Sequence, residues 1–407
     1  MNRQVQRWLV RLGFCVSCLS LIAACSGLER GPTVPLADTD QVTVLGLPNG
    51  RFWADTDGAK LAREAADALQ RERAASGATG GKLGPAYFLA VSGGGDNGAF
   101  GSGLLCGWED AGTMPSFKLV TGVSTGAMIA PFVFLGPAYH DRLCTLYTSI
   151  KPSDVLDSRG IYGMLFSDAL ADTTPLADLI ARYVTDQMLA DIAREYQKGR
   201  LLLIGTTSLD VQRPVIWNIG AIAASGKPEA LDLVRKIILA SAAIPGAFPP
   251  VMIDVEAAGK RYQEMDVDGG AVAQTFLYPP DLGLRVDLRS AEHARERHAY
   301  IIRNGRLDPN WTLVQRQFLT IAGRAIATMI HFSGYNDVLR IYAITKRDGV
   351  DYNLAYIEPD FVTTKREEFD PAYMRALFDY GYAKGRSGKA WRKAPPILED
   401  IPTGPPR

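Results

Sequence analysis

The sequence has few of the residues that metal sites and nucleic-acid surfaces require. Its 407 residues include four histidines and five cysteines, and their spacing matches no metal-ligand pattern. Lysine plus arginine and aspartate plus glutamate number 44 each, so no basic excess marks a nucleic-acid-binding protein. We therefore expect no metal and no nucleic-acid partner. The 47% hydrophobic and 22% charged residues are typical of a globular protein with a sizeable core.

An export signal is predicted at the N-terminus. Arginines at 3, 7 and 11 precede the apolar stretch Leu12–Ala24, which is short for a bilayer span. The stretch ends in Ile22-Ala23-Ala24-Cys25, which resembles a bacterial lipoprotein box. We predict cleavage of residues 1–24 and lipidation of Cys25; the alternative is an ordinary cleaved signal with an incidental cysteine.

The predicted mature chain is mildly acidic. Removal of three arginines leaves 41 basic against 44 acidic residues, a net charge of −3, so membrane attachment would depend on the acyl chains. Ser26 after the cysteine is typical of outer-membrane lipoproteins, which predicts an envelope protein anchored to the outer membrane and facing the periplasm. Cys106 and Cys144 remain after cleavage. A disulfide between them is possible in the periplasm, but we expect free thiols because Cys106 lies on a predicted core helix.

The centre of the predicted fold is a strand, a glycine loop and a helix. The apolar run Tyr87–Val91 is typical of a buried parallel strand. It leads to Gly93, Gly94 and Gly95, and a helix is predicted to start near Asn97. Backbone amides at the start of a helix stabilise negative charge, so the loop is predicted to hold an anion.

A second strand, Phe117–Thr121, precedes a serine motif. Gly122-Val123-Ser124-Thr125-Gly126 fits the nucleophile elbow G-x-S-x-G, in which a sharp turn exposes the serine. Because the carboxyl ends of parallel strands meet at one edge of a sheet, the glycine loop and Ser124 are predicted to share a site.

Dinucleotide binding is the alternative for the glycine loop, because Gly93, Gly95 and Gly98 also satisfy G-x-G-x-x-G. That fingerprint expects an acidic residue about 20 positions further on, at the end of the second strand. Residues 118–122 contain no carboxylate, which favours a serine enzyme.

The predicted base is a carboxylate. Asp268 is followed by Gly269 and Gly270, so a strand end can there approach other backbone closely. Asp266 points the same way two residues earlier, and we favour Asp268 because the glycines follow it directly. The histidines downstream of Asp268 lie outside turn motifs and are interpreted as ordinary surface or core residues: His293, His298 and His331.

Gly93 to Gly98, Gly122 to Gly126 and Asp268 to Gly270, in this order, resemble the patatin-like phospholipase family. The resemblance covers residues 87–276 and includes Ser241-Ala242-Ala243-Ile244-Pro245. It implies an α/β fold with three layers, α/β/α, around a mostly parallel central sheet. It also implies lipid acyl-ester hydrolysis of phospholipase A or lysophospholipase type, without a cofactor or metal.

The resemblance assigns roles by position. Ser124 is the nucleophile and Asp268 the proton acceptor. The elbow glycines are Gly122 and Gly126, the glycines of the aspartate turn are Gly269 and Gly270, and the oxyanion hole comprises Gly93, Gly94, Gly95, Asn97 and Gly98. The family usually has Arg or Lys where Asn97 stands, which is a departure. Two alternatives remain: a Ser-His-Asp carboxylesterase and an inactive envelope lipid-binding lipoprotein.

The predicted organisation has five parts. Residues 1–24 are the signal, 25–84 a tether and helix, 85–285 the catalytic domain, 286–394 an α/β extension packed on it, and 395–407 a proline-rich tail. Within 154–172, four apolar residues are interpreted as a lid, an acyl pocket or a plain surface segment: Tyr162, Met164, Leu165 and Phe166. Thr312–Phe332 is predicted to form a long helix.

Overall fold

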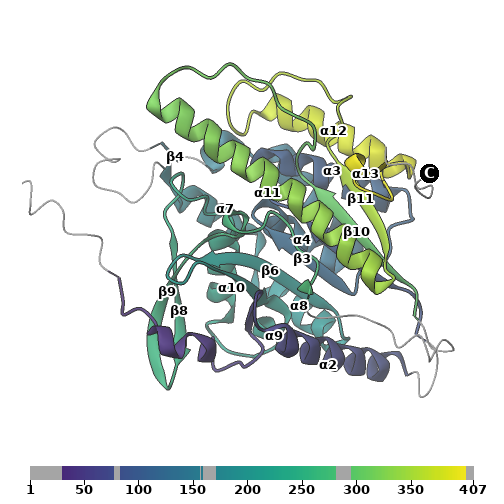
Figure 1. Ribbon diagram of the computed structural model, residues 1–407. Helices are drawn as coiled ribbons and strands as arrows, with labels where there is room; N and C mark the ends of the chain where they lie inside the picture. Colours follow the sequence, from purple (N-terminus) through teal and green to yellow (C-terminus); the bar gives the residue numbers. More distant parts are fainter. Residues whose placement is uncertain (1–29, 78–82, 156, 159–170, 281–294, 400–407) are drawn as a thin grey trace, which may run out of the picture.

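The chain forms three layers around one mixed sheet in a computed structural model that describes residues 30–77, 83–155, 157–158, 171–280 and 295–399 (Figure 1). The strands of the main sheet are β1 (Arg51–Trp53), β2 (Ala86–Val91), β3 (Leu119–Val123), β6 (Leu201–Ser208), β7 (Arg213–Asn218), β8 (Val251–Ala257), β9 (Lys260–Asp268), β10 (Arg297–Arg303) and β11 (Asp351–Tyr356). Their order is β1-β7-β6-β3-β2-β10-β11, and β9 pairs with both β6 and β8.

The centre of the sheet is parallel, as predicted. Strands β6, β3, β2, β10 and β11 pair in parallel. Strands β1, β7, β8 and β9 pair antiparallel with their neighbours. The carboxyl ends of β2, β3 and β10 therefore lie at one edge of the sheet, beside the end of the antiparallel strand β9.

Side-chain alternation along the strands builds a core on each face. In β2, Leu89 and Val91 face one core, while Ala90 faces the other. The helices that contribute to the first core are α3 (Gly98–Asp110), α4 (Thr125–Leu135), α5 (His140–Ser149), α7 (Thr174–Tyr183), α8 (Asp186–Gln197), α9 (Ile219–Ala223), α10 (Ala230–Ser241) and α12 (Pro371–Ser387). Helices α2 (Gly58–Ser76) and α11 (Phe318–Asp348) cover the opposite face. The fold is thus α/β with helices on both sides of the sheet.

The glycines of α3 pack mainly against another helix. A Cβ atom on Gly103 would lie 2.1 Å from the carbonyl oxygen of Phe378, and one on Gly107 would lie 2.1 Å from that of Tyr382. Conversely, a Cβ on Gly385 of α12 would lie 2.1 Å from the Leu104 carbonyl oxygen. Glycine destabilises a helix, but at these positions it allows the backbones of α3 and α12 to approach each other closely.

The C-terminal segment contributes two strands and a long helix, whose bounds differ from the sequence-based expectation. Strands β10 and β11 extend the central sheet beside β2. The helix predicted over Thr312–Phe332 instead spans Phe318–Asp348 and ends at Gly349, whose φ of 64° forms a left-handed cap. Within the described part of the chain, no helix has the length and apolarity needed to cross a bilayer.

The described part of the predicted tether is held against the sheet. Arg30 forms an ion pair with Asp210 at 2.7 Å. The Gly31 amide donates to the Gln263 side chain at 2.7 Å. Thr43 exchanges backbone hydrogen bonds with Glu256. From residue 30 onward this segment is therefore not a loose linker.

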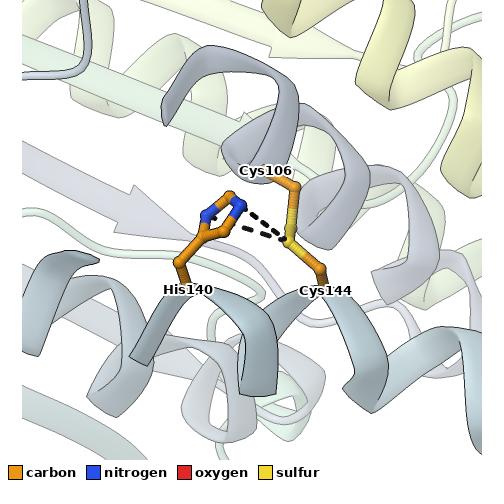
Figure 2. A group of neighbouring side chains, drawn as sticks. All are labelled: Cys106, His140 and Cys144. Carbon is orange, nitrogen blue, oxygen red and sulfur yellow. Dashed lines mark hydrogen bonds between the residues drawn. A yellow bond between two sulfur atoms is a disulfide. The ribbon is translucent and has the colours of Figure 1, made fainter. Parts of the chain in front are cut away.

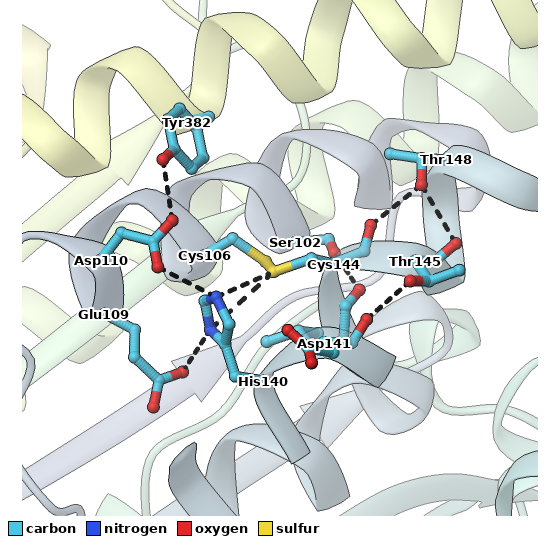
Figure 3. The surroundings of a disulfide bond; sticks show 11 residues. Ser102, Cys106, Glu109, Asp110, His140, Asp141, Cys144, Thr145, Thr148 and Tyr382 are labelled. Carbon is cyan, nitrogen blue, oxygen red and sulfur yellow. Dashed lines mark hydrogen bonds and ion pairs between the residues drawn. A yellow bond between two sulfur atoms is a disulfide. The ribbon is translucent and has the colours of Figure 1, made fainter. Parts of the chain in front are cut away.

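Cys106 and Cys144 form a disulfide between α3 and α5, which corrects the expectation of free thiols (Figure 3). Their Cα atoms lie 5.9 Å apart, a normal separation for a disulfide. His140 Nε2 lies 3.6 Å from the Cys144 sulfur (Figure 2). The ligand-type atoms of these three residues all lie within 4.8 Å of one another, a grouping that sequence spacing did not reveal. With both sulfurs in the disulfide, neither is a free thiolate ligand.

Candidate active site

Ser124 lies directly after β3 in a strained turn. Its φ of 55° and ψ of −123° lie outside the regions that residues with a side chain normally adopt. Helix α4 begins at the next residue, so the turn joins a strand to a helix as the elbow motif predicts. A residue held in such a conformation is costly, and such strain is concentrated at functional sites.

The elbow glycines are required by close backbone contacts. A Cβ atom on Gly122 would lie 2.4 Å from the Gly126 carbonyl oxygen, and one on Gly126 would lie 2.1 Å from that of Val91. The turn therefore lies directly against the end of β2, where the glycine loop begins.

Asp268 is the last residue of β9 and reaches Ser124 through β6. Val123 pairs with Gly205 of β6, and Asp268 pairs with Thr206 of the same strand. The Asp268 carboxylate accepts a hydrogen bond from the Gly270 amide at 2.7 Å. The Ser124 side chain lowers the pKa of the Asp268 carboxyl group, against the effect of burial. A Cβ atom on Gly269 would lie 2.6 Å from the Gly205 carbonyl oxygen, so glycine permits this approach.

Burial sets the protonation behaviour of Asp268. It raises the pKa of this carboxyl group to about 7, while the Ser124 side chain and the Gly270 amide act in the opposite direction. A carboxylate with a pKa near 7 exchanges protons readily at neutral pH, as a general base must.

Asp266 belongs to a different network. Burial and the nearby Glu264 raise its pKa to about 7, but its Oδ2 accepts a hydrogen bond from Thr206 at 2.6 Å. Trp217 donates to the same threonine oxygen at 2.7 Å. Asp266 is therefore held by Thr206 of β6, and the assignment of Asp268 as the partner of Ser124 stays a prediction.

The glycine loop lies next to the serine. A Cβ atom on Gly93 would be 3.1 Å from Ser124 Cβ. The Gly93 amide donates to the Gln274 carbonyl at 2.9 Å, whereas the Gly94 amide has no acceptor among the residues that the structure describes. Gly95 has a φ of 58°, in the region that favours glycine. The Gly94 amide is thus available to a ligand.

Asn97 and Gly98 anchor the loop to its surroundings. The Asn97 side-chain oxygen accepts a hydrogen bond from the Tyr373 hydroxyl of α12 at 2.6 Å. A Cβ atom on Gly98 would lie 2.5 Å from the Thr125 hydroxyl, beside the elbow. The side chain at position 97 therefore ties the start of α3 to α12.

Two residues at the end of β10 support the loop and were not predicted. The Asn304 side chain donates to the Ser92 carbonyl at 2.8 Å and accepts from the Gly101 amide at 3.0 Å. Buried Arg303 donates to the Gly93 carbonyl at 3.2 Å. Both residues lie about 200 positions from the loop in sequence, so no local motif linked them to it.

Ser241 and Gln274 connect the motifs. The Ser241 hydroxyl accepts from the Ser124 amide at 2.9 Å and donates to the Gly205 carbonyl at 2.7 Å. The Gln274 side chain donates to the Gly270 carbonyl at 3.0 Å. Ser241 belongs to the stretch Ser241 to Pro245, which is part of the family resemblance. No other feature of the sequence indicated that Ser241 contacts the site.

The described histidines lie away from Ser124. His298 stacks on Tyr87 and pairs with it in register near the beginning of β2, whereas Ser124 follows the end of the neighbouring strand. His331 lies on α11 against Phe332, and His140 binds Glu109 and Asp110. His293 lies outside the described residues. Among the described histidines, none hydrogen-bonds Ser124 or Asp268.

A mostly apolar cavity of about 360 Å³ borders the site. Its wall includes Val123, Gly205, Gly269 and Phe276, so it touches the neighbours of Ser124 and Asp268. The proposed lid residues Tyr162, Met164, Leu165 and Phe166 lie outside the described residues, as does Cys25.

The central part of this chain is similar to known phospholipases. A family model described as "Patatin-like phospholipase" matches residues 89–279. The cUMP-AMP-activated phospholipase of Escherichia coli is 31% identical over 194 residues, which are 46% of this chain and 54% of that protein. This chain thus spans about half the length of that relative.

Two solved structures were also found by shape. VipD from Legionella pneumophila has a TM-score of 0.36 and 13% identity, over 75% of this chain and 67% of its own. The type III effector protein ExoU has a TM-score of 0.33 and 11% identity, over 76% of this chain and 54% of its own.

Proposed function

We propose, from the premise that residues 89–279 belong to the patatin-like phospholipase family, that this chain is a serine hydrolase of lipid acyl esters. The single observation that carries the proposal is the arrangement of Ser124, on its turn after β3, and buried Asp268, at the end of β9, in one sheet where β3 and β9 pair with consecutive residues of β6. It places a nucleophile on a strained turn beside a base whose pKa is about 7.

The proposed reaction has two halves. Asp268 takes the hydroxyl proton as Ser124 Oγ bonds to the ester carbonyl carbon, giving a tetrahedral oxyanion. Collapse of this intermediate breaks the ester bond, and Asp268 returns the proton to the leaving alcohol. Water then attacks the acyl-enzyme with Asp268 again as base, which releases the fatty acid and restores Ser124.

The glycine loop is the proposed oxyanion hole. The Gly94 amide, which has no acceptor among the described residues, and the Gly95 amide are the proposed donors to the developing charge. Removal of one such donor typically costs about 3 kcal/mol of transition-state stabilisation. Arg303 and Asn304 fix the loop by donating hydrogen bonds to the carbonyls of Gly93 and Ser92, respectively. The Asn97 side chain is fixed by a hydrogen bond from the Tyr373 hydroxyl.

The proposed substrates are phospholipids or lysophospholipids. The apolar cavity next to Val123 and Gly269 offers space for an acyl chain beside the nucleophile. The relative from Escherichia coli is named a phospholipase, which supports the same substrate class.

The proposed location is the cell envelope, with Cys25 lipidated and the chain attached to the outer membrane on its periplasmic side. The lipoprotein-type sequence before Cys25 supports this location. The Cys106–Cys144 disulfide also supports it, because disulfides persist in the oxidising periplasm.

Hydrolysis of a lipid panel by wild type, Ser124→Ala and Ser149→Ala tests the function. Ser149 is an exposed serine on α5 and serves as the matched control. We expect Ser124→Ala to lose at least about a thousandfold in kcat/KM and all labelling by a fluorophosphonate, with Ser149→Ala unchanged. Full hydrolysis by folded Ser124→Ala would contradict the proposal.

The same experiment separates the alternatives. Loss of activity in His298→Ala would support a Ser-His-Asp carboxylesterase. A folded wild-type protein that neither hydrolyses lipid nor reacts with the fluorophosphonate would be an inactive lipid-binding protein.

A further inference from the structure

The first half of α11 and the segment before it have no buried side chain among the residues described. We call residues 309–333 the α11 arm. Every described residue in it is exposed or only partly buried, and the first buried position is Gly334. Figure 1 shows this end of α11 at the outer edge of the molecule. In proteins most of the stability of a helix comes from packing of its apolar face, so an exposed apolar face here calls for a partner.

The α11 arm carries most of the large apolar side chains that are exposed in the described part of the chain. Of the twelve large apolar side chains that are exposed in the described chain, seven lie between 311 and 332. They include Trp311 at 85% exposure and Met329 at 72%. Ile321, Met329 and Phe332 recur at helical spacing and share one face of α11, with Ile326 beside them. Together these residues form an apolar stripe along α11 that ends at Phe332.

The charge on the α11 arm has one sign. No aspartate or glutamate occurs between Asp308 and Asp337, whereas Arg316 and Arg324 lie within this interval. An apolar stripe with cations and no acids is complementary to an anionic lipid surface. The chain as a whole lacks this bias, because its acidic and basic residues balance at 44 each.

The α11 arm leads directly to the candidate active site. A Cβ atom on Gly334 would lie 2.6 Å from the Arg303 guanidinium carbon. Asp337 accepts a hydrogen bond from the Gln274 amide at 2.6 Å, and the Gln274 carbonyl accepts from Gly93. The stripe from Ile321 to Phe332 therefore begins within one helical turn of residues that contact the glycine loop, and extends outward by about 16 Å.

We propose that the α11 arm docks on the surface of an anionic lipid bilayer, with its apolar stripe in the interface and its arginines at the head groups. This inference rests on the proposed function, because it presents the candidate active site to a lipid substrate. Lipidation at Cys25 would hold the chain near a membrane, whereas the α11 arm would orient the site toward it.

Vesicle flotation tests the docking surface. The probe is a set of vesicles of phosphatidylcholine with or without 30% phosphatidylglycerol (about one anionic lipid in three). The protein is the full chain carrying Cys25→Ser, so that no acyl anchor contributes. Met329→Glu/Phe332→Glu disrupts the stripe, and Leu36→Glu/Ile397→Glu is the matched control at exposed apolar sites elsewhere. We expect about tenfold or greater loss of binding in the first variant and none in the control.

The arginines provide an independent variant. Arg316→Gln/Arg324→Gln is expected to reduce binding to anionic vesicles severalfold and to leave the weak binding to phosphatidylcholine unchanged. Unchanged flotation of both the stripe and the arginine variants would overturn the proposal. A wild-type dimer in light scattering that Met329→Glu/Phe332→Glu converts to monomer, with no effect on flotation, would instead assign the stripe to self-association and also overturn it.

Activity separates this inference from the proposed function. We expect Met329→Glu/Phe332→Glu to hydrolyse the soluble ester p-nitrophenyl butyrate at the wild-type rate and to lose hydrolysis of vesicle lipid. If Ser124→Ala retained activity, the proposed function would fail, but flotation would still decide whether the α11 arm binds lipid.

Discussion

Arg303 and Gly93 are joined by a hydrogen bond of 3.2 Å from the guanidinium to the carbonyl oxygen. That carbonyl belongs to the same peptide group as the Gly94 amide, the proposed oxyanion donor. Burial lowers the pKa of Arg303 to about 10, so the side chain stays charged at neutral pH. A cation on the carbonyl polarises the peptide group and strengthens donation by its N–H.

Arg303→Met is therefore expected to lower kcat by about 10- to 100-fold with a small change in KM. Arg303→Lys should restore part of the loss because it keeps the charge. Steady-state kinetics of the two variants, with melting temperatures as a check on folding, measure this effect. A purely structural role for Arg303 predicts equal kcat in folded Met and Lys variants, and that result would refute the polarising role.

The pH dependence of hydrolysis follows from Asp268. Its pKa is raised to about 7, and only the ionised carboxylate accepts the serine proton. We expect kcat/KM to rise with pH through about 7 and then level off. Asp268→Asn should abolish activity, whereas Asp266→Asn should keep both activity and the rising limb. A limb that disappears in Asp266→Asn would move the assignment to Asp266.

Asp266 is expected to affect stability instead. Its pKa is raised from an ordinary value near 4 to about 7 by burial and by Glu264. The protonated group thus stabilises the fold fully below about pH 4, and this contribution is lost as pH rises through about 7. Asp266→Asn should flatten the decline in unfolding free energy between pH 4 and pH 8 by on the order of 2 kcal/mol. Urea unfolding across this range measures the change, and parallel curves for variant and wild type would disprove it.

The ion pair between Arg51 and Glu264 is buried, with an N–O distance of 2.5 Å and side-chain exposures of 2% and 3%. Arg51→Met should destabilise the fold by about 3–5 kcal/mol, because Glu264 is left without its partner. Arg51→Met/Glu264→Leu should recover much of the loss. Arg213 is the control, since it also lies over Trp53 but pairs with half-exposed Asp55. Arg213→Met should cost about 1 kcal/mol or less, and an equal cost for both single variants would contradict the role of burial.

The disulfide between Cys106 and Cys144 closes a loop of 38 residues. A cross-link of this span stabilises a fold by about 4 kcal/mol in the chain-entropy account. Reduction, or Cys106→Ala/Cys144→Ala, should therefore lower the unfolding free energy by a few kcal/mol, measured by chemical denaturation. The double variant should no longer respond to reductant. If wild type is equally stable with and without reductant, the disulfide does not stabilise the fold.

Local sequence patterns were sufficient to predict the central motifs. The glycine loop, the elbow at Ser124 and the Asp268 turn each need particular backbone geometry, and glycine at set positions reveals that need in the sequence. The parallel arrangement of β2 and β3 followed from the same segments. The pairing of Ser124 with Asp268 as nucleophile and base stays a prediction of those patterns, which the Asp268→Asn variant tests.

Sequence patterns did not predict the bounds of α11 or the disulfide between α3 and α5. The bounds of α11 were wrong: the predicted helix ended at Phe332, just before Ser333 and Gly334, whereas α11 continues through this glycine to Asp348. The disulfide was missed because two helices must pack before their cysteines can meet.

The sequence by itself determined the fold class and the turns on which Ser124 and Asp268 lie, because strand ends and glycine turns are encoded within a few neighbouring residues. Only the tertiary structure decided that Arg303 and Asn304 support the glycine loop, and that Asp266 belongs to another network. These contacts depend on the register of strands more than a hundred residues apart, and strand register is a property of the assembled sheet.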